Sequence, residues 1–159
     1  MRKTLIAATT LMALLMALLL APAASQAVIQ PQRSISGVAV GMNQVQVRAA
    51  LGVPRVTRGS NDFGPYTVFR YTGGITVTFQ GNTRVSSVET TGLGDRTVRG
   101  VGVGSTEAIV RARVAGVRCV TESGFRHCHL GQFLAGRRIT DFVIRSGRVT
   151  RVTVGVVID

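Results

Sequence analysis

The sequence predicts an α+β fold made of two tandem units, each a short helix followed by about four antiparallel strands, with the helices packed on one face of the sheet. The segment 37–41, Gly-Val-Ala-Val-Gly, recurs 63 residues later as 100–104, Gly-Val-Gly-Val-Gly. A capped helical segment and then β-branched runs separated by glycines follow each copy. We therefore expect residues 34–96 and 97–159 to be two repeats. They should pack as one body, because a lone unit of about 63 residues buries too little surface.

The amino-terminal segment, residues 1–27, has the pattern of a secretory signal peptide. Basic residues precede an apolar run over residues 5–20, and small residues follow as far as Ala27. This pattern predicts export with cleavage after Ala27, and an uncleaved membrane anchor is the alternative. Because the first cysteine is Cys119, we expect no lipoprotein anchor. The chain should be secreted or held in the cell envelope, with residues 28–33 as a polar leader without assigned structure.

The first repeat should begin with a helix that carries its own start and stop signals. Asn43 is a suitable N-cap, and Gln46 stands where it completes a capping box. The helix is expected to run from about Gln44 to Leu51, and Gly52 suits the position just after its end.

The second repeat has equivalent signals. Thr106 occupies the N-cap position, and Glu107 complements the positive end of the helix. Val110 is expected on the buried face, and Gly116 is expected to end the helix.

Alternation of apolar and polar residues predicts a half-buried antiparallel strand over residues 75–80. Ile75, Val77 and Phe79 would face the core. The equivalent segment of the second repeat places Asp141 at a core position, so we expect a one-residue slip or a bulge near it. The sheet face opposite the helices is expected to remain available to a partner.

The two cysteines are placed symmetrically about Ser123 and Gly124. If those residues form a two-residue turn, Cys119 and Cys128 face each other at a non-hydrogen-bonded pair, where the close approach suits a disulfide. Export favours the oxidised form. Closing so short a loop should add about 2 to 3 kcal/mol to the free energy of unfolding.

A metal site is the alternative for this hairpin, because His127 and His129 flank Cys128, and Cys119 could add a second thiolate. Alternation along a strand places both histidines on the face opposite Cys128. Ligation by that set would require the hairpin to break, so we expect a disulfide and no metal.

A binding loop is predicted over residues 58–66, joining the first two strands of the first repeat. It contains Asp62, Phe63 and Tyr66 among glycine and proline, a composition typical of loops that use aromatic side chains as anchors. We expect these three residues to contact a partner. The alternative is that Phe63 and Tyr66 fold back onto the core.

The sequence contains no recognisable catalytic constellation. The glycines of residues 100–104 resemble a phosphate-binding loop, but no lysine follows them. The seven acidic residues are isolated from one another along the chain. We therefore expect neither enzymatic activity nor a cofactor.

The chain is strongly basic, with a net charge of +12 that falls to +10 when Arg2 and Lys3 leave with the signal peptide. This charge favours contact with anionic cell-wall polymers or lipids. The alternative is a solvated, arginine-rich surface, because the arginines are scattered and Arg137 and Arg138 are the only adjacent pair. Nucleic acid is not expected, because no aromatic and basic recognition motif is present.

Two known families resemble the sequence. Gly-Met-Asn at 41–43 and Leu-Gly-Val-Pro at 51–54 resemble the signature of small outer-membrane assembly lipoproteins of the SmpA/OmlA (BamE-like) type. The predicted tandem units, export and hairpin disulfide are similar to the β-lactamase inhibitor protein family. Both resemblances imply a protein-binding module.

In the inhibitor family, a hairpin loop carrying an aspartate beside an aromatic residue enters the target protein, and Asp62 with Phe63 matches that feature. The resemblance thus implies contact with an exported protein of unknown identity, through this loop and the open sheet face. A basic structural protein of the cell envelope, bound to anionic polymers or lipids, is the alternative. No oligomeric state is predicted.

Overall fold

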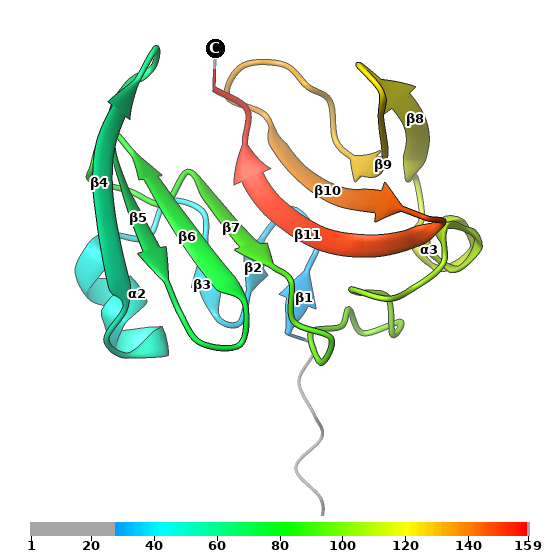
Figure 1. Ribbon diagram of the computed structural model, residues 1–159, viewed down its shortest axis with the longest axis horizontal. Coiled ribbons are helices and arrows are strands. Elements are labelled where there is room, and N and C mark those ends of the chain that lie inside the picture. The colour runs from blue at the N-terminus through cyan, green and yellow to red at the C-terminus, as the bar shows by residue number, and fades with distance from the viewer. Residues whose placement is uncertain (1–27, 159) are drawn as a thin grey trace, which may run out of the picture.

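The computed structural model describes residues 28–158, so the predicted signal peptide lies outside the described residues (Figure 1). The first strands are short: β1 (Ile29–Gln30), β2 (Ser34–Ile35) and β3 (Val38–Ala39). Next come α2 (Gln44–Leu51), β4 (Arg55–Asn61), β5 (Gly64–Arg70), β6 (Ile75–Gln80) and β7 (Ser87–Thr90). The remaining elements are α3 (Glu107–Arg113), β8 (Arg118–Glu122), β9 (Phe125–Leu130), β10 (Arg138–Arg145) and β11 (Arg148–Val156).

The prediction of an α+β fold made of tandem helix-plus-strand units is wrong. The structure is mostly β, with 48% of residues in strands and 11% in helices. The strands β4 to β11 form one eight-stranded sheet in the order β4-β5-β6-β7-β11-β10-β9-β8, and β1 to β3 form a three-stranded sheet. The helices have only 8 and 7 residues. Because β7 pairs with β11, strands from both predicted repeats share one continuous hydrogen-bonded sheet.

The eight-stranded sheet is antiparallel throughout and strongly bent. Figure 1 shows β4 and β8 at its opposite ends, with α2 and the three-stranded sheet behind the half formed by β4 to β7. Between β10 and β11 the register shifts at Val143 and Ile144. The irregularity predicted near Asp141 is therefore confirmed just beyond that residue. The extra residue is Thr150 on β11, and it lets Val149 and Val152, three positions apart, both be buried.

The leader, residues 28–33, was given no structure from the sequence, whereas the structure places Ile29 and Gln30 in β1. Ile29 lies in β1, is 1% exposed, and donates its N–H to the carbonyl of Arg96 at 3.0 Å. The sequence signal failed because strands of two residues are too short to show any periodicity.

Both predicted helix starts are confirmed. Asn43 and Gln46 form a reciprocal capping box at α2, which spans the predicted residues and is followed by Gly52 with a φ of 83°. The hydroxyl of Thr106 accepts from the N–H of Ile109 at the start of α3. The second helix ends at Arg113, before the predicted stop at Gly116.

The same backbone contacts occur just before each helix. The carbonyl of Gly41 accepts from Arg84 Nη1 at 3.0 Å, and the carbonyl of Gly104 accepts from Arg148 Nη1 at 3.0 Å. The Gly41 and Gly104 N–H groups donate to the carbonyls of Val85 and Val149, respectively. These contacts place the 37–41 segment beside residues 84–85 and the 100–104 segment beside residues 148–149. Each segment thus contacts residues from its own half of the chain. The duplication itself remains a prediction.

One hydrophobic core joins the sheet, both helices and the amino-terminal strands. Its largest fully buried side chains include Phe69, Phe79 and Phe142. The alternation predicted for β6 is confirmed, because Ile75, Val77 and Phe79 are buried and the residues between them are partly exposed. In residues 28–158, no helix has the length and apolar character to cross a membrane.

Candidate functional site

The segment predicted as a long loop is a tight hairpin, so that expectation is wrong. The strands β4 and β5 pair as far as Asn61 opposite Gly64, and Asp62 with Phe63 forms the turn between them. The glycine and proline residues suggested a loop. Pro65, however, lies near the end of the β4–β5 pair at the edge of the sheet, where the missing backbone N–H of proline is tolerated. Asp62 and Phe63 therefore occupy the tip of a projecting hairpin (Figure 1).

Gln80 on β6 holds this hairpin tip in place. Its Nε2 donates to the carbonyl oxygens of Phe63 at 3.0 Å and Gly64 at 3.1 Å. Asn61 Oδ1 accepts from the Phe63 N–H at 3.0 Å. The backbone of the turn is thus tied to the sheet, while the Phe63 side chain is 52% exposed.

Tyr66 does not join Phe63 at the tip. It lies opposite Gly59 on β4 and Gln80 on β6. Its ring covers Gly59 so closely that a Cβ there would lie 2.5 Å from Tyr66 Oη. Neither Phe63 nor Tyr66 belongs to the hydrophobic core, so the alternative in which both fold back onto it is not observed.

The side of the eight-stranded sheet that faces away from the core is here called the open sheet face. Strand register assigns it, among others, the following residues: Tyr66, Val68, Arg70, Thr76, Thr78, Gln80, Glu89, Arg118, Val120, His127, His129, Asp141, Val143, Arg151 and Thr153. Glu89 sits near its middle, 3.4 Å from Arg151. Burial raises the pKa of Glu89 against the opposing effect of Arg151. The face is polar, with a carboxyl group at its centre.

The predicted disulfide is confirmed. Cys119 and Cys128 are bonded, and β8 and β9 pair in the predicted register around the Ser123–Gly124 turn. A Glu107 oxygen lies within 4.8 Å of both sulfurs. Because the sulfurs are bonded to each other, they are not thiolates that could ligate a metal with Glu107.

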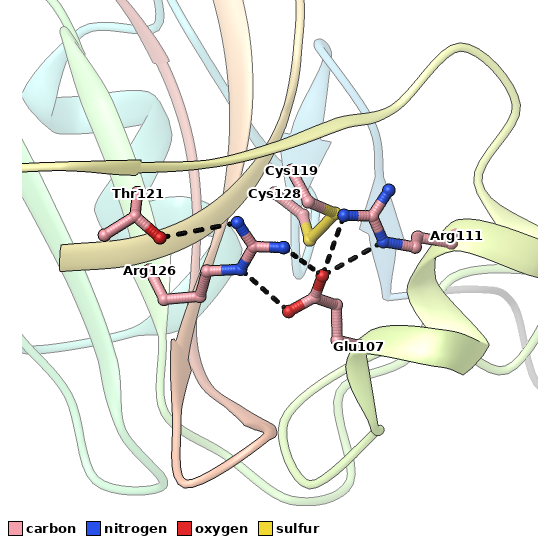
Figure 2. Close-up of polar contacts among 6 residues, drawn as sticks. All are labelled: Glu107, Arg111, Cys119, Thr121, Arg126 and Cys128. Carbon is pink, nitrogen blue, oxygen red and sulfur yellow. Dashed lines mark hydrogen bonds and ion pairs between the residues drawn. A yellow bond between two sulfur atoms is a disulfide. The ribbon is translucent and has the colours of Figure 1, made fainter.

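Glu107 links α3 to this hairpin, as Figure 2 shows. Its carboxylate accepts from Arg111 Nε at 3.0 Å and from Arg126 Nε at 2.9 Å, and it also contacts Arg126 Nη2. Arg126 continues the network to Thr121. The hydrogen bond from Arg126 is the largest effect that lowers the pKa of Glu107 to about 2. The network fixes the helix against β9 beside the disulfide.

Replacing Glu107 with glutamine is expected to lower the free energy of unfolding by about 1 kcal/mol at neutral pH, because it removes the ionic part of this network. The wild-type carboxyl has a folded-state pKa of about 2, below the ordinary value of 4.5. The stabilising contribution of this carboxylate to the free energy of unfolding is therefore fully present above about pH 4.5 and is lost as the pH falls to about 2. Urea denaturation across that range should show the Glu107→Gln difference shrinking with acid. Asp62→Asn, at an exposed turn, is the control; an equal, pH-independent loss in both variants would contradict the assignment.

Sequence reasoning missed the contacts that shape these sites. The spacing of Glu107 and Arg111 could have signalled an i,i+4 pair on a helix. The Glu107–Arg126 contact depends on the packing of α3 against β9, and the His127–Asp141 contact depends on the register of β9 with β10. The role of Gln80 depends on the hairpin that was expected to be a loop.

Comparisons with known proteins assign no family. No protein-family model matches the chain, and no curated protein matches it. Among solved structures, YjgB, a DUF4309 family protein from Bacillus subtilis, is similar with a TM-score of 0.49 and 18% identity, covering 82% of this chain and 88% of that one. An extracellular protein containing an SCP domain from Bacillus anthracis is similar with a TM-score of 0.47 and 8% identity, covering 73% of this chain and 43% of that one. Similarities this weak support no argument about function.

Proposed function

We propose that the chain is an exported, non-catalytic binding module that contacts another exported protein through the β4–β5 hairpin tip and the open sheet face. The observation that carries the proposal is the 52% exposed Phe63 side chain at the tip of a hairpin whose backbone is tied down. Export rests on the predicted signal peptide. The proposal extends the resemblance to protein-binding families.

The fixed backbone of the tip favours binding. An anchor residue loses less conformational freedom on association when its backbone is already ordered. The bonds from Gln80 and Asn61 order the turn in the free protein. An aromatic ring presented in this way can enter a pocket of a partner, with Asp62 beside it to pair with a positive group.

The open sheet face supplies area around such an anchor. Val68 and Val143 are apolar residues on this face, and both are largely buried among polar neighbours. Polar side chains surrounding an aromatic anchor match the rim of a non-obligate interface. This arrangement favours a reversible partner over a permanent subunit.

Replacing Asp62 and Phe63 with alanine together is expected to weaken retention of the partner by about tenfold or more, equivalent to about 1.4 kcal/mol. The measurement is capture of proteins from culture medium by the immobilised chain, with quantification of what stays bound. Phe125→Ala is the matched control, because Phe125 is 59% exposed beside the other hairpin turn, between β8 and β9. Equal capture by the double variant and the control would contradict the hairpin assignment.

A second function, binding of anionic cell-envelope polymers or lipids, is favoured by one observation. Arg137 and Arg138, with Gln32 and Gln132, line a hollow of about 580 Å³. Guanidinium groups at such a hollow suit phosphate or carboxylate groups. This alternative predicts that retention of the chain on the anionic polymer or lipid weakens steeply as salt is raised. Binding to a protein through an aromatic anchor should depend much less on salt.

A further inference from the structure

The strand β4 forms one edge of the eight-stranded sheet and pairs with β5 alone, as Figure 1 shows. It is seven residues long, and all of its residues except Val56 are exposed. Within residues 28–158, no backbone hydrogen bond joins β4 to any element other than β5. The outer side of β4 is therefore open to another strand.

The register of the β4–β5 hairpin shows which backbone groups of this edge point outward. The two-residue turn makes Asn61 and Gly64 a hydrogen-bonded pair, after which non-hydrogen-bonded and hydrogen-bonded pairs alternate. Ser60 thus lies opposite Pro65 at a non-hydrogen-bonded pair, which agrees with the missing N–H of proline. The residues whose N–H and C=O groups point away from β5 are Val56, Arg58 and Ser60.

The edge is positively charged. The hairpin over residues 55–70 contains three arginines and one aspartate. Arg55 lies opposite Arg70 on the open sheet face, and alternation places Arg58 on the other face. Arg70 Nη1 donates to the Thr57 hydroxyl at 3.0 Å, which brings a third guanidinium group to β4. None of these three arginines forms an ion pair with a carboxylate of residues 28–158.

This charge selects the kind of strand that can be added. A second copy pairing through its own β4 would bring the arginines of two copies together, and like charges on neighbouring strands are destabilising. Acidic side chains on an added strand would instead meet Arg55 on one face and Arg58 on the other. The opposite edge of the sheet, β8, has five residues and carries both Arg118 and Glu122, so its charge favours neither sign.

We propose that β4 binds an acidic, extended peptide segment, which adds to the sheet as a further strand. Hydrogen bonds to the outward backbone groups of Val56, Arg58 and Ser60 supply the pairing, and the arginines supply the preference for acidic side chains. The proposal deepens the protein-binding function proposed above, on which it rests, because it assigns to the partner an acidic segment beside the hairpin tip.

Nuclear magnetic resonance of the ¹⁵N-labelled, disulfide-bonded chain tests this with a synthetic peptide as long as β4, made of threonine, valine and glutamate, with glutamate on both faces of its extended form. The amide protons of Val56, Arg58 and Ser60 should shift downfield and exchange more slowly, because they gain hydrogen bonds. Those of Thr57 and Gly59, already bonded to β5, should change less. The same peptide with lysine in place of glutamate should bind at least about tenfold more weakly.

Two outcomes of this titration would overturn the proposal. One is the absence of a change at the three outward amides at millimolar peptide. The other is equal binding of the lysine peptide. A dimer in analytical ultracentrifugation that Ser60→Pro disrupts would also overturn it, because a second copy would then occupy the edge.

Variants separate strand addition from attraction by charge alone. Ser60→Pro removes an outward N–H and leaves the hydrogen bonds between β4 and β5 in place, so it should weaken binding of the glutamate peptide by about fivefold. Arg58→Glu should weaken it by about tenfold, whereas Arg118→Glu on β8 is the matched control and should bind like the wild type. Binding unchanged in Ser60→Pro, or lost equally in Arg118→Glu, would contradict strand addition at β4.

Two further measurements keep the result independent of folding and of the hairpin tip. An N-methylated glutamate peptide, which lacks the donors for pairing, should bind the unaltered chain at least about tenfold more weakly. The Asp62→Ala/Phe63→Ala double variant should bind the unmethylated glutamate peptide like the wild type, because the edge of β4 is intact. Failure of the tip to capture a partner would therefore leave the peptide result unchanged, and equal binding of the N-methylated peptide would overturn strand addition alone.

Discussion

Phe142→Ala is expected to lower the free energy of unfolding by about 3 to 5 kcal/mol, the range for truncating a buried aromatic residue. Phe142 is fully buried on β10 and pairs with Cys128 on β9 and Val152 on β11. Its loss would leave a cavity in the core that the sheet shares with the helices and amino-terminal strands. Urea denaturation followed by circular dichroism measures the change.

The same experiment tests whether the chain folds as one body. Because the strands of both predicted repeats share one sheet, Phe142→Ala should shift a single cooperative transition. Phe125→Ala is the control, since Phe125 is 59% exposed and its truncation should change the free energy of unfolding by at most about 0.5 kcal/mol. Two separate transitions, only one of them shifted, would contradict the shared core.

Removing the disulfide by replacing Cys119 and Cys128 with alanine is expected to lower the free energy of unfolding by about 2 to 3 kcal/mol. The bond closes a short hairpin with a sequence separation of 9, so the unfolded chain gains only modest freedom without it. Cys128 is fully buried, and alanine avoids leaving a polar atom there. The measurement is urea denaturation of the double variant beside the oxidised wild type.

The matched control for the disulfide is the wild-type chain under reducing conditions. It should lose a similar amount of stability, because the cross-link is broken while the side chains remain. A reduced wild type as stable as the oxidised form would contradict a stabilising role for the bond.

The local features of the fold were predictable, because they depend on neighbouring residues. The capping box of Asn43 and Gln46, the alternation along β6, and the register that joins Cys119 to Cys128 all follow from short-range spacing. These signals define individual helices, strands and hairpins. They do not say how strands from distant parts of the chain pair.

The failed predictions concern pairing over long distances. The repeated glycine and valine pattern suggested two helix-plus-strand units packed as one body, whereas the structure is mostly β and the pairing of β7 with β11 builds one continuous sheet. Residues 28–33 were taken as a polar leader without assigned structure, yet Ile29 lies in β1 and its N–H donates to the carbonyl of Arg96. Gly59 and Pro65 suggested a loop, but Gly59 makes room for the ring of Tyr66 within a hairpin.

The sequence indicated which residues to consider for the candidate site, but it did not indicate how the fold positions them. Asp62 and Phe63 were identified from composition, and the structure places them at an exposed turn; their contact with a partner stays a prediction. Tyr66 is separated from them along β5. The bracing by Gln80 and the pairing of His127 with Asp141 depend on strand register, which the sequence pattern did not determine.

Retention of the captured partner across a salt series tests the proposed protein-binding function most directly. The wild type, the Asp62→Ala/Phe63→Ala double variant and Phe125→Ala are compared from about 0.01 M to about 1 M salt, over which the screening length falls from about 30 to about 3 Å. The account predicts that wild-type and Phe125→Ala retention change little with salt and that the double variant binds weakly throughout. Retention that falls steeply with salt and is equal in all three proteins would contradict it, because charge alone would then hold the chain to an anionic surface.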